Sequence, residues 1–228
     1  MKPNDTDLNF HAGHRERLRQ KFLDGHLADY EVLELLLSFV IPRCDVRPLA
    51  RGLVAHFGGI YAVLTAPISE LMGYKGVGRN TAIFIKAIAS LMQTSCKFEL
   101  TQSPIFHDEI TLRNYCILKI GGKTIEEFHV LYLDINLRLI ADDLHTIGTI
   151  DWSPVFPRDI LKRALDLNAR SVVLLHNHPT PNTSFSEPDV KITSEIKNIL
   201  ATCDINLYDH YLVSGGIVYS ARDLFLLK

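Results

Sequence analysis

Residues 171–193 read SVVLLHNHPTPNTSFSEPDVKIT, and this stretch decides the fold of the second half of the chain. It opens with a β-branched and aliphatic run, which predicts a buried strand, and the run ends in His176-Asn177-His178-Pro179. Pro179 cannot donate to a sheet ladder, so we expect the strand to stop there. Side chains two residues apart on a strand share a face, so both imidazoles can reach one ion.

Seven residues separate His178 from Ser186-Glu187-Pro188-Asp189, which has the composition of a helix start. In a first turn, Asp189 would be kept ionised by the helix dipole, as a metal ligand must be. Two histidines and one carboxylate leave a fourth tetrahedral position for water, which is the ligand count of a catalytic zinc. Such an ion lowers the pKa of its water toward ~7 and polarises a carbonyl. An HxH pair alone is common by chance, and SxxD is also an ordinary helix cap.

The runs around this stretch alternate between strand-like and helix-like. Apolar β-rich runs occur at residues 128–134, 137–141, 205–213 and 216–220. Helical stretches with an apolar stripe occupy residues 157–168 and 187–203. Alternating strands and helices indicate an α/β layered domain.

The first hundred residues have helical apolar spacing throughout, for example Leu49, Leu53 and Phe57 before the stop signal Gly58-Gly59. They predict a small all-α domain. The periodicity is lost between about residues 93 and 106. We therefore expect two domains, at residues 1–98 and 104–228.

The composition is that of a globular protein: 228 residues, 47% hydrophobic and 22% charged. Residues 1–20 lack the apolar core of a signal peptide, and no apolar run could cross a bilayer, so we expect a cytoplasmic protein without membrane contact. The four cysteines contain no CxxC pair and predict neither a disulfide framework nor a cysteine zinc site. Residues 1–100 carry 12 Lys+Arg against 10 Asp+Glu, and residues 101–228 carry 12 against 16, so the first half is mildly basic.

The joint pattern HxHP, seven residues, SxxD resembles the metal motif of the JAMM (JAB1/MPN/Mov34) metalloprotease domains. With GTIDWSPVFPRDILKRAL upstream and YDHYLVSGG downstream, it resembles the bacterial RadC (UPF0758) branch. The run from IPRCDVRPLARGLVAHFGG to LMGYKGVGRNTA is similar to the helix-hairpin-helix region that precedes the JAMM domain in that family. The resemblance implies a mixed sheet flanked by helices, one zinc per chain, and a peptide or protein substrate.

Carried over to this sequence, the resemblance implies His176, His178 and Asp189 as zinc ligands, and Ser186 as a donor to the oxyanion of the tetrahedral intermediate. It also implies a glutamate on an early strand as general base. Glu127, which directly precedes the apolar strand, is the residue we favour over Glu126, whose side chain would point to the opposite face. Weaker alternatives stand near the end of the next strand: Asp142 and Asp143.

Where RadC proteins usually have Ser-Gly after HNHP, this chain has Thr180-Pro181. The ligand spacing is unchanged by this departure. Substrate access and the geometry of the loop are what it puts in question.

In the first half, Lys75-Gly76-Val77-Gly78-Arg79-Asn80 predicts a turn that opens a helix. Such a turn offers backbone N–H groups to a phosphate, and small glycines allow close approach, which is how a helix-hairpin-helix holds DNA backbone without reading sequence. Lys75 and Arg79 would add Coulomb attraction. A plain interhelical turn is the alternative.

Other residues receive weaker interpretations. His210, in YDHYL, is assigned a supporting role and not ligation. Trp152 is read as a packing or cleft-wall residue. The basic residues Arg15, Arg17, Arg19 and Lys21 most simply form a solvated helix face.

Two functions follow. The first is a zinc-dependent hydrolase of the metallopeptidase or isopeptidase type, with metal-activated water and Glu127 as base. The second is a DNA-associated repair or recombination factor that binds DNA backbone through its hairpin, with the metal domain as scaffold or nuclease. A zinc nucleobase deaminase is disfavoured because it would need HxE and a later PCxxC.

Overall fold

The computed structural model describes residues 5–42, 44–105, 109–148, 155–180 and 182–227, and for residues 5–12 the backbone alone. The chain divides into two compact units, Met1–Ile88 and Ala89–Lys228. The first is helical in its described part, and the second contains a five-stranded sheet, which confirms the predicted α/β class with a helical N-terminal region. None of the described helices is long and apolar enough to cross a membrane.

The helices of the first unit are separated by segments that contain glycine or proline. They are α1 (Asp5–Leu23), α2 (Asp29–Val40), α3 (Arg47–Phe57), α4 (Ile60–Thr65), α5 (Ile68–Gly73) and the first part of α6 (Arg79–Gln102). Helix α3 ends at Gly58, whose φ of 90° is a left-handed conformation that glycine adopts without strain. Their apolar faces meet in a core that includes Leu37, Leu53 and Leu71, each fully buried.

Helix α6 continues through the segment in which the sequence loses its periodicity, as far as Gln102. Most of its residues beyond position 90 are exposed or half-buried, so no apolar stripe marks them as helical. The division between the two units falls inside this helix, between Ile88 and Ala89. The expected limits, 1–98 and 104–228, place the boundary further along the chain and stay a prediction.

The second unit is built on a mixed sheet with strand order β2-β1-β3-β4-β5. The strands are β1 (Glu127–Leu133), β2 (Leu139–Ile147), β3 (Ser171–Asn177), β4 (Asn206–Ser214) and β5 (Ile217–Ser220). Only the pairing of β3 with β4 is parallel among the described strands. The crossover between those two contains helix α9 (Glu187–Ala201), as a parallel connection requires.

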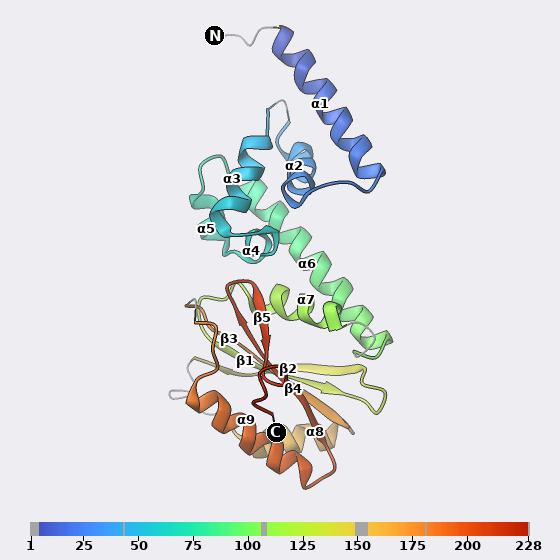
Figure 1. Cartoon of the computed structure of the whole chain (residues 1–228), viewed down its shortest axis with the longest axis vertical. Helices are drawn as coiled ribbons and strands as arrows, with labels where there is room; N and C mark the ends of the chain where they lie inside the picture. The colour runs from blue at the N-terminus through green and yellow to red at the C-terminus, as the bar shows by residue number, and fades with distance from the viewer. Residues whose placement is uncertain (1–4, 43, 106–108, 149–154, 181, 228) are drawn as a thin grey trace. The chain divides into compact units, whose positions relative to one another are not determined.

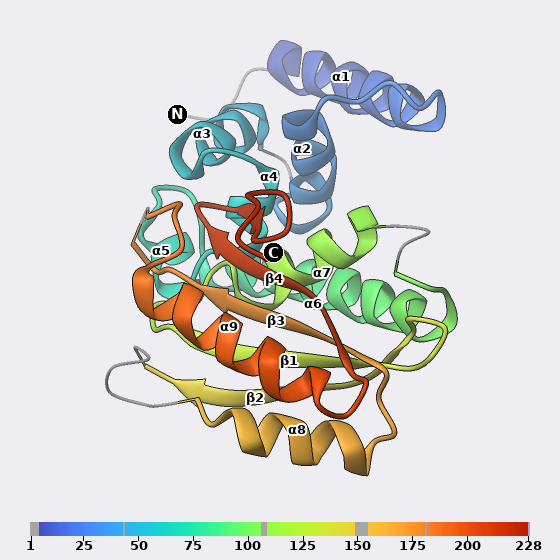
Figure 2. The ribbon, with the colours of Figure 1, turned by 60° about the horizontal axis from the view of Figure 1, so that its bottom comes forward.

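Helices cover both faces of the sheet. Figures 1 and 2 show α7 (Glu109–Ile120) on one face, and α8 (Pro157–Asp166) with α9 on the other. The central strand β3 is buried along its whole length, which explains why its sequence is a continuous apolar run without alternation. On the α8/α9 face the core includes Val130, Val172, Leu174 and Ile196.

Candidate metal centre

The two histidines of HNHP stand where the sequence places them, at the end of the central strand. Strand β3 ends at Asn177, and His178 stays extended beyond it because its N–H donates to the carbonyl of Val213 on β4, over 3.0 Å. His176 and His178 therefore lie on the same face of the sheet, the one that α9 covers. Both rings are almost fully buried, with 5% and 8% of their side-chain surface exposed.

Asp189 approaches the histidines from the first turn of α9. Ser186 is the N-cap of this helix: its Oγ accepts from the Asp189 N–H, and Asp189 Oδ2 accepts from the Ser186 N–H over 2.8 Å. This reciprocal pair is the capping box that the SxxD spacing predicts. It fixes the carboxylate at 3% residue exposure, facing the end of β3.

The ligand atoms have the spacing that one tetrahedral ion requires. The Nε2 atoms of His176 and His178 are 3.3 Å apart, and Asp189 Oδ2 lies 3.5 Å and 3.6 Å from them. Two ligands bound about 2.0–2.1 Å from a tetrahedral ion are separated by about 3.3–3.4 Å. In the part of the chain that the structure describes, these three residues form the group of His, Cys, Asp or Glu that could hold a metal ion.

The electrostatics of the three groups favour a shared positive charge. Burial alone would raise the pKa of Asp189, but the neighbouring imidazoles of His176 and His178 hold that pKa well below its usual range. The pKa of His178 is raised, chiefly by its hydrogen bond with Asp189. An ionised carboxylate against two imidazoles is the donor set that a divalent cation takes in place of protons.

Glu127 is not brought to this cluster. Its carboxylate contacts Lys123 Nζ at 2.8 Å and His129 Nε2 at 3.0 Å, on the α7 face of the sheet. The register explains this placement, because Phe128 pairs directly with His176 and the two rings stack with centroids 6.3 Å apart. Residues on either side of Phe128 in the strand must then point away from the histidines.

Glu126 directly precedes β1, so alternation along the strand would place its side chain on the face of Phe128 and the histidines. Its backbone is still extended, since its carbonyl accepts from the Gly148 N–H over 2.8 Å. The raised pKa of His178, due first to Asp189, has a further contribution from attraction to Glu126. Alternation along the strand thus favours the glutamate that the sequence argument ranked second, and the identity of the base stays a prediction.

The other two carboxylates considered for the base are engaged elsewhere. Asp142 is fully buried on the α7 face, where it binds Lys119 at 2.7 Å and His129 at 3.3 Å. Asp143 pairs with Arg163 at 2.7 Å.

Sequence reasoning missed the role of Asn177, which lies between the two histidines and points to the opposite face. Its Oδ1 accepts from the Glu127 N–H over 2.9 Å, and its Nδ2 donates to the carbonyls of Ile125 and Lys123 over 3.2 and 3.4 Å. Asn177 is 2% exposed. It thus holds the segment that carries Glu126 against the end of β3. The only signal in the sequence is a polar residue at the end of a strand buried on both faces.

Phe185 is a second residue that spacing could not identify. Its ring contacts those of His176 and His210, with centroids 5.7 and 5.1 Å apart. Phe185 thus covers the cluster on the side of the loop that precedes α9. At the position where this chain departs from the family pattern, the carbonyl of Thr180 accepts from Ser214 Oγ. Pro181 and Trp152 lie outside the described residues.

The glycine turn of the first unit connects α5 to α6. Lys75, Gly76, Gly78 and Arg79 are all exposed, whereas Val77 is buried and anchors the turn. Gly76 has φ 99°, a conformation that side chains rarely adopt.

Two of the N-terminal basic residues contact groups outside α1, and two others lie on its exposed face. Arg15 donates to the carbonyls of Ile41 and Cys44, and Lys21 pairs with Glu31. Arg19 pairs with Glu16, and Arg17 is exposed, which agrees with a solvated face.

Comparison with known proteins agrees with this geometry. A family model described as RadC-like JAB domain matches residues 106–226. The UPF0758 protein SPO0054 of Ruegeria pomeroyi is 38% identical over 212 residues, which cover 92% of this chain and 95% of that protein. The similarity therefore includes most of the helical first unit as well as the metal centre. The chain belongs to the RadC (UPF0758) family.

Proposed function

We propose that this protein is a zinc-dependent hydrolase that cleaves an amide bond in a peptide or an isopeptide-linked protein. The observation that carries the proposal is the spacing of His176 Nε2, His178 Nε2 and Asp189 Oδ2, which suits one tetrahedral ion with a fourth position free. Domains of the JAB type are often hydrolytic, which supports the same assignment.

Zinc in such a site supplies Lewis acidity toward a carbonyl and activates water as a nucleophile near neutral pH. The protein's part is to hold the ligands, exclude other water and move protons. Ser186 Oγ currently donates to Asp189 Oδ2 over 2.7 Å. We propose that it exchanges this bond for one to the oxyanion of the substrate, while it continues to accept from the Asp189 N–H.

We assign the general base to Glu126 in place of Glu127. The pairing of Phe128 with His176 supports this assignment, because alternation favours Glu126 for the face of the histidines, and so does the attraction between Glu126 and His178. Glu127 contacts Lys123 and His129 on the opposite face. A base must reach the proton that it takes, so geometry decides before pKa.

The two glutamates provide a matched pair of variants for the test. Zinc content is measured in protein purified without chelators, and hydrolysis is followed with a fluorogenic peptide library and an isopeptide-linked lysine substrate. We expect Glu126→Gln and Glu127→Gln to retain zinc, and only Glu126→Gln to lose activity, by about 10²- to 10⁴-fold.

Two results would reject parts of the proposal. Equal and substoichiometric zinc in wild type and Asp189→Ala would remove the metal site. Loss of activity in Glu127→Gln with normal activity in Glu126→Gln would return the base to Glu127.

A DNA-associated role is the second candidate. The observation that favours it is the joint exposure of Lys75, Gly76, Gly78 and Arg79 at the turn before α6. In this case the hairpin binds DNA backbone, and the metal domain acts as scaffold or nuclease. The double variant Lys75→Ala/Arg79→Ala should weaken DNA binding and its salt dependence, while His176→Ala/His178→Ala should leave both unchanged.

A further inference from the structure

Behind the metal centre, a chain of hydrogen bonds connects one ligand back to another. His176 Nδ1 lies 2.8 Å from His210 Nε2, and His210 Nδ1 lies 2.6 Å from Thr193 Oγ1. Thr193 Oγ1 in turn donates to the backbone carbonyl of Asp189, one helical turn earlier on α9. The chain therefore begins at one proposed zinc ligand and ends at another.

The direction of this chain can be read from its end. A carbonyl oxygen only accepts, so the single hydroxyl proton of Thr193 is committed to Asp189. Thr193 Oγ1 must then accept from His210, which places a proton on His210 Nδ1. A second proton on Nε2 would make His210 a cation at a position with no exposed surface. The proton between the two rings therefore belongs to His176 Nδ1.

We propose that His210 and Thr193 are positioning residues that hold His176 as the Nδ1-protonated tautomer, so that its Nε2 lone pair points into the cluster. The inference rests on the proposed metal site, and it assigns to that site two residues that do not touch the ion. A single contact favours the same tautomer for His178. Its Nδ1 lies 3.1 Å from the backbone carbonyl of Asn182, which can only accept a hydrogen bond. Both imidazoles are thereby prepared as ligands before any ion binds.

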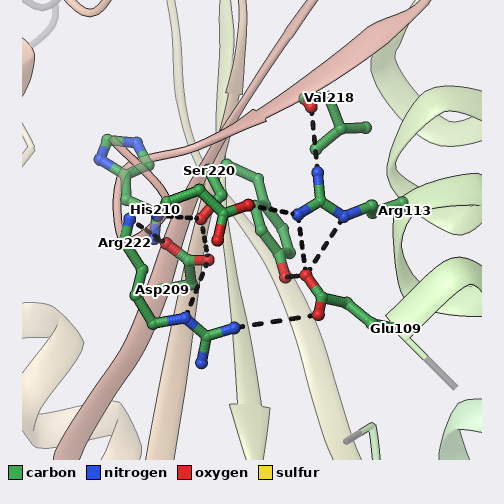
Figure 3. A network of polar contacts seen from close by, with 9 residues as sticks. Glu109, Arg113, Asp209, His210, Val218, Ser220 and Arg222 are labelled. Atoms are coloured by element: carbon green, nitrogen blue, oxygen red, sulfur yellow. Dashed lines mark hydrogen bonds and ion pairs between the residues drawn. The ribbon is translucent and has the colours of Figure 1, made fainter. Parts of the chain in front are cut away.

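The backbone of His210 is anchored by the residue that precedes it on β4. Its backbone N–H donates over 2.7 Å to the carboxylate of Asp209, which also accepts from Ser220 Oγ over 2.6 Å and from the Arg222 N–H over 3.0 Å. Figure 3 shows this network, with Asp209 turned toward Arg222 and the His210 ring turned away from it. Glu109 and Arg113 connect the same network to α7. Neighbouring residues of β4 thus serve opposite faces of the sheet.

Thr193→Val is the decisive variant, because valine has nearly the shape of threonine but cannot accept from His210. Thr193→Ser keeps the hydroxyl and is the matched control. The tautomers of His176 and His210 are read in the zinc-free protein from long-range ¹H–¹⁵N NMR correlations. Zinc affinity is measured by competition with a chromophoric chelator.

We expect wild type and Thr193→Ser to show a protonated His176 Nδ1. Thr193→Val should show a mixture of tautomers and bind zinc about 10- to 100-fold more weakly, the range found when a partner of a ligating histidine is removed. Equal zinc affinity and equal ¹⁵N shifts in Thr193→Val and wild type would overturn the inference. If wild type binds no zinc, the metal proposal fails, and the ¹⁵N shifts of its His176 still decide the tautomer.

Discussion

Acid should loosen the start of β1, because its polar anchor on the α7 face depends on the ionised carboxylate of Asp142. Burial alone would raise the pKa of Asp142, but hydrogen bonds from His129, Lys119 and Tyr115 lower it to about 2. His129 in turn contacts Glu127, the residue next to the proposed base. The carboxylate thus supports the segment on which the chemistry depends.

The magnitude follows from the depressed pKa. A drop from 3.8 to about 2 corresponds to roughly 2 kcal/mol of unfolding free energy, at about 1.36 kcal/mol per unit of pKa. Because the pKa is lowered in the folded state, this stability is present in full above the pKa of the unfolded chain. It is lost as the pH falls from about 5 toward 2.

Asp142→Asn should remove this contribution at every pH. We expect the variant to be about 2 kcal/mol less stable than wild type at pH 7, with the difference shrinking as the pH falls toward 2. The assay is urea unfolding followed by the fluorescence of the single tryptophan, which belongs to the second unit in sequence. Asp143→Asn is the control, since solvent screens its partly exposed pair with Arg163. Parallel stability curves for Asp142→Asn and wild type across this pH range would refute the reasoning.

Three further predictions concern the hydrogen bonds of Asn177, those of Lys86, and the effect of zinc on stability. Asn177→Ala should keep zinc but lower the rate of hydrolysis at least tenfold, because the segment carrying Glu126 loses three hydrogen bonds. Asn177→Asp keeps the acceptor and should lose less activity. Equal rates of hydrolysis in Asn177→Ala and wild type would contradict this prediction. Lys86→Met should destabilise the first unit by about 1–3 kcal/mol in thermal unfolding, because the ammonium donates to the carbonyls of Leu64, Thr65 and Ala66, each at 3.0 Å. Zinc at about 100 times its dissociation constant should stabilise the second unit by about 2.7 kcal/mol, and Asp189→Ala should abolish that shift.

The proximity of the candidate metal ligands could be predicted because their signals are local. His176 and His178 differ by two positions on a strand, and Ser186 with Asp189 forms a capping box within a single turn, so neither pair requires knowledge of the tertiary fold. The contact between His176 and His210 joins residues 34 positions apart through a parallel pairing. Strand β4 could be recognised from sequence, but the register in which it pairs with β3 could not.

The glutamate was harder to assign for a definite physical reason. Face assignment from sequence relies on alternation of apolar and polar residues, and β1 has none, because nearly all of its residues are buried between helices on both faces. Two consecutive glutamates before such a strand differ by one position, and one position exchanges the faces. The pairing of Phe128 with His176 is the observation on which our preference for Glu126 over Glu127 rests.

The pattern His-Asn-His can therefore be understood as two functions assigned to two faces of one strand end. The histidines point to the α9 face, where Asp189 completes the candidate ligand set. Asn177 points to the α7 face and binds the backbone on both sides of Glu126. Since the two candidate ligands and the anchor of the proposed base alternate along the same three residues, a shift in the register of β3 would displace all of them together. The central strand thus positions the proposed base relative to the two candidate histidine ligands.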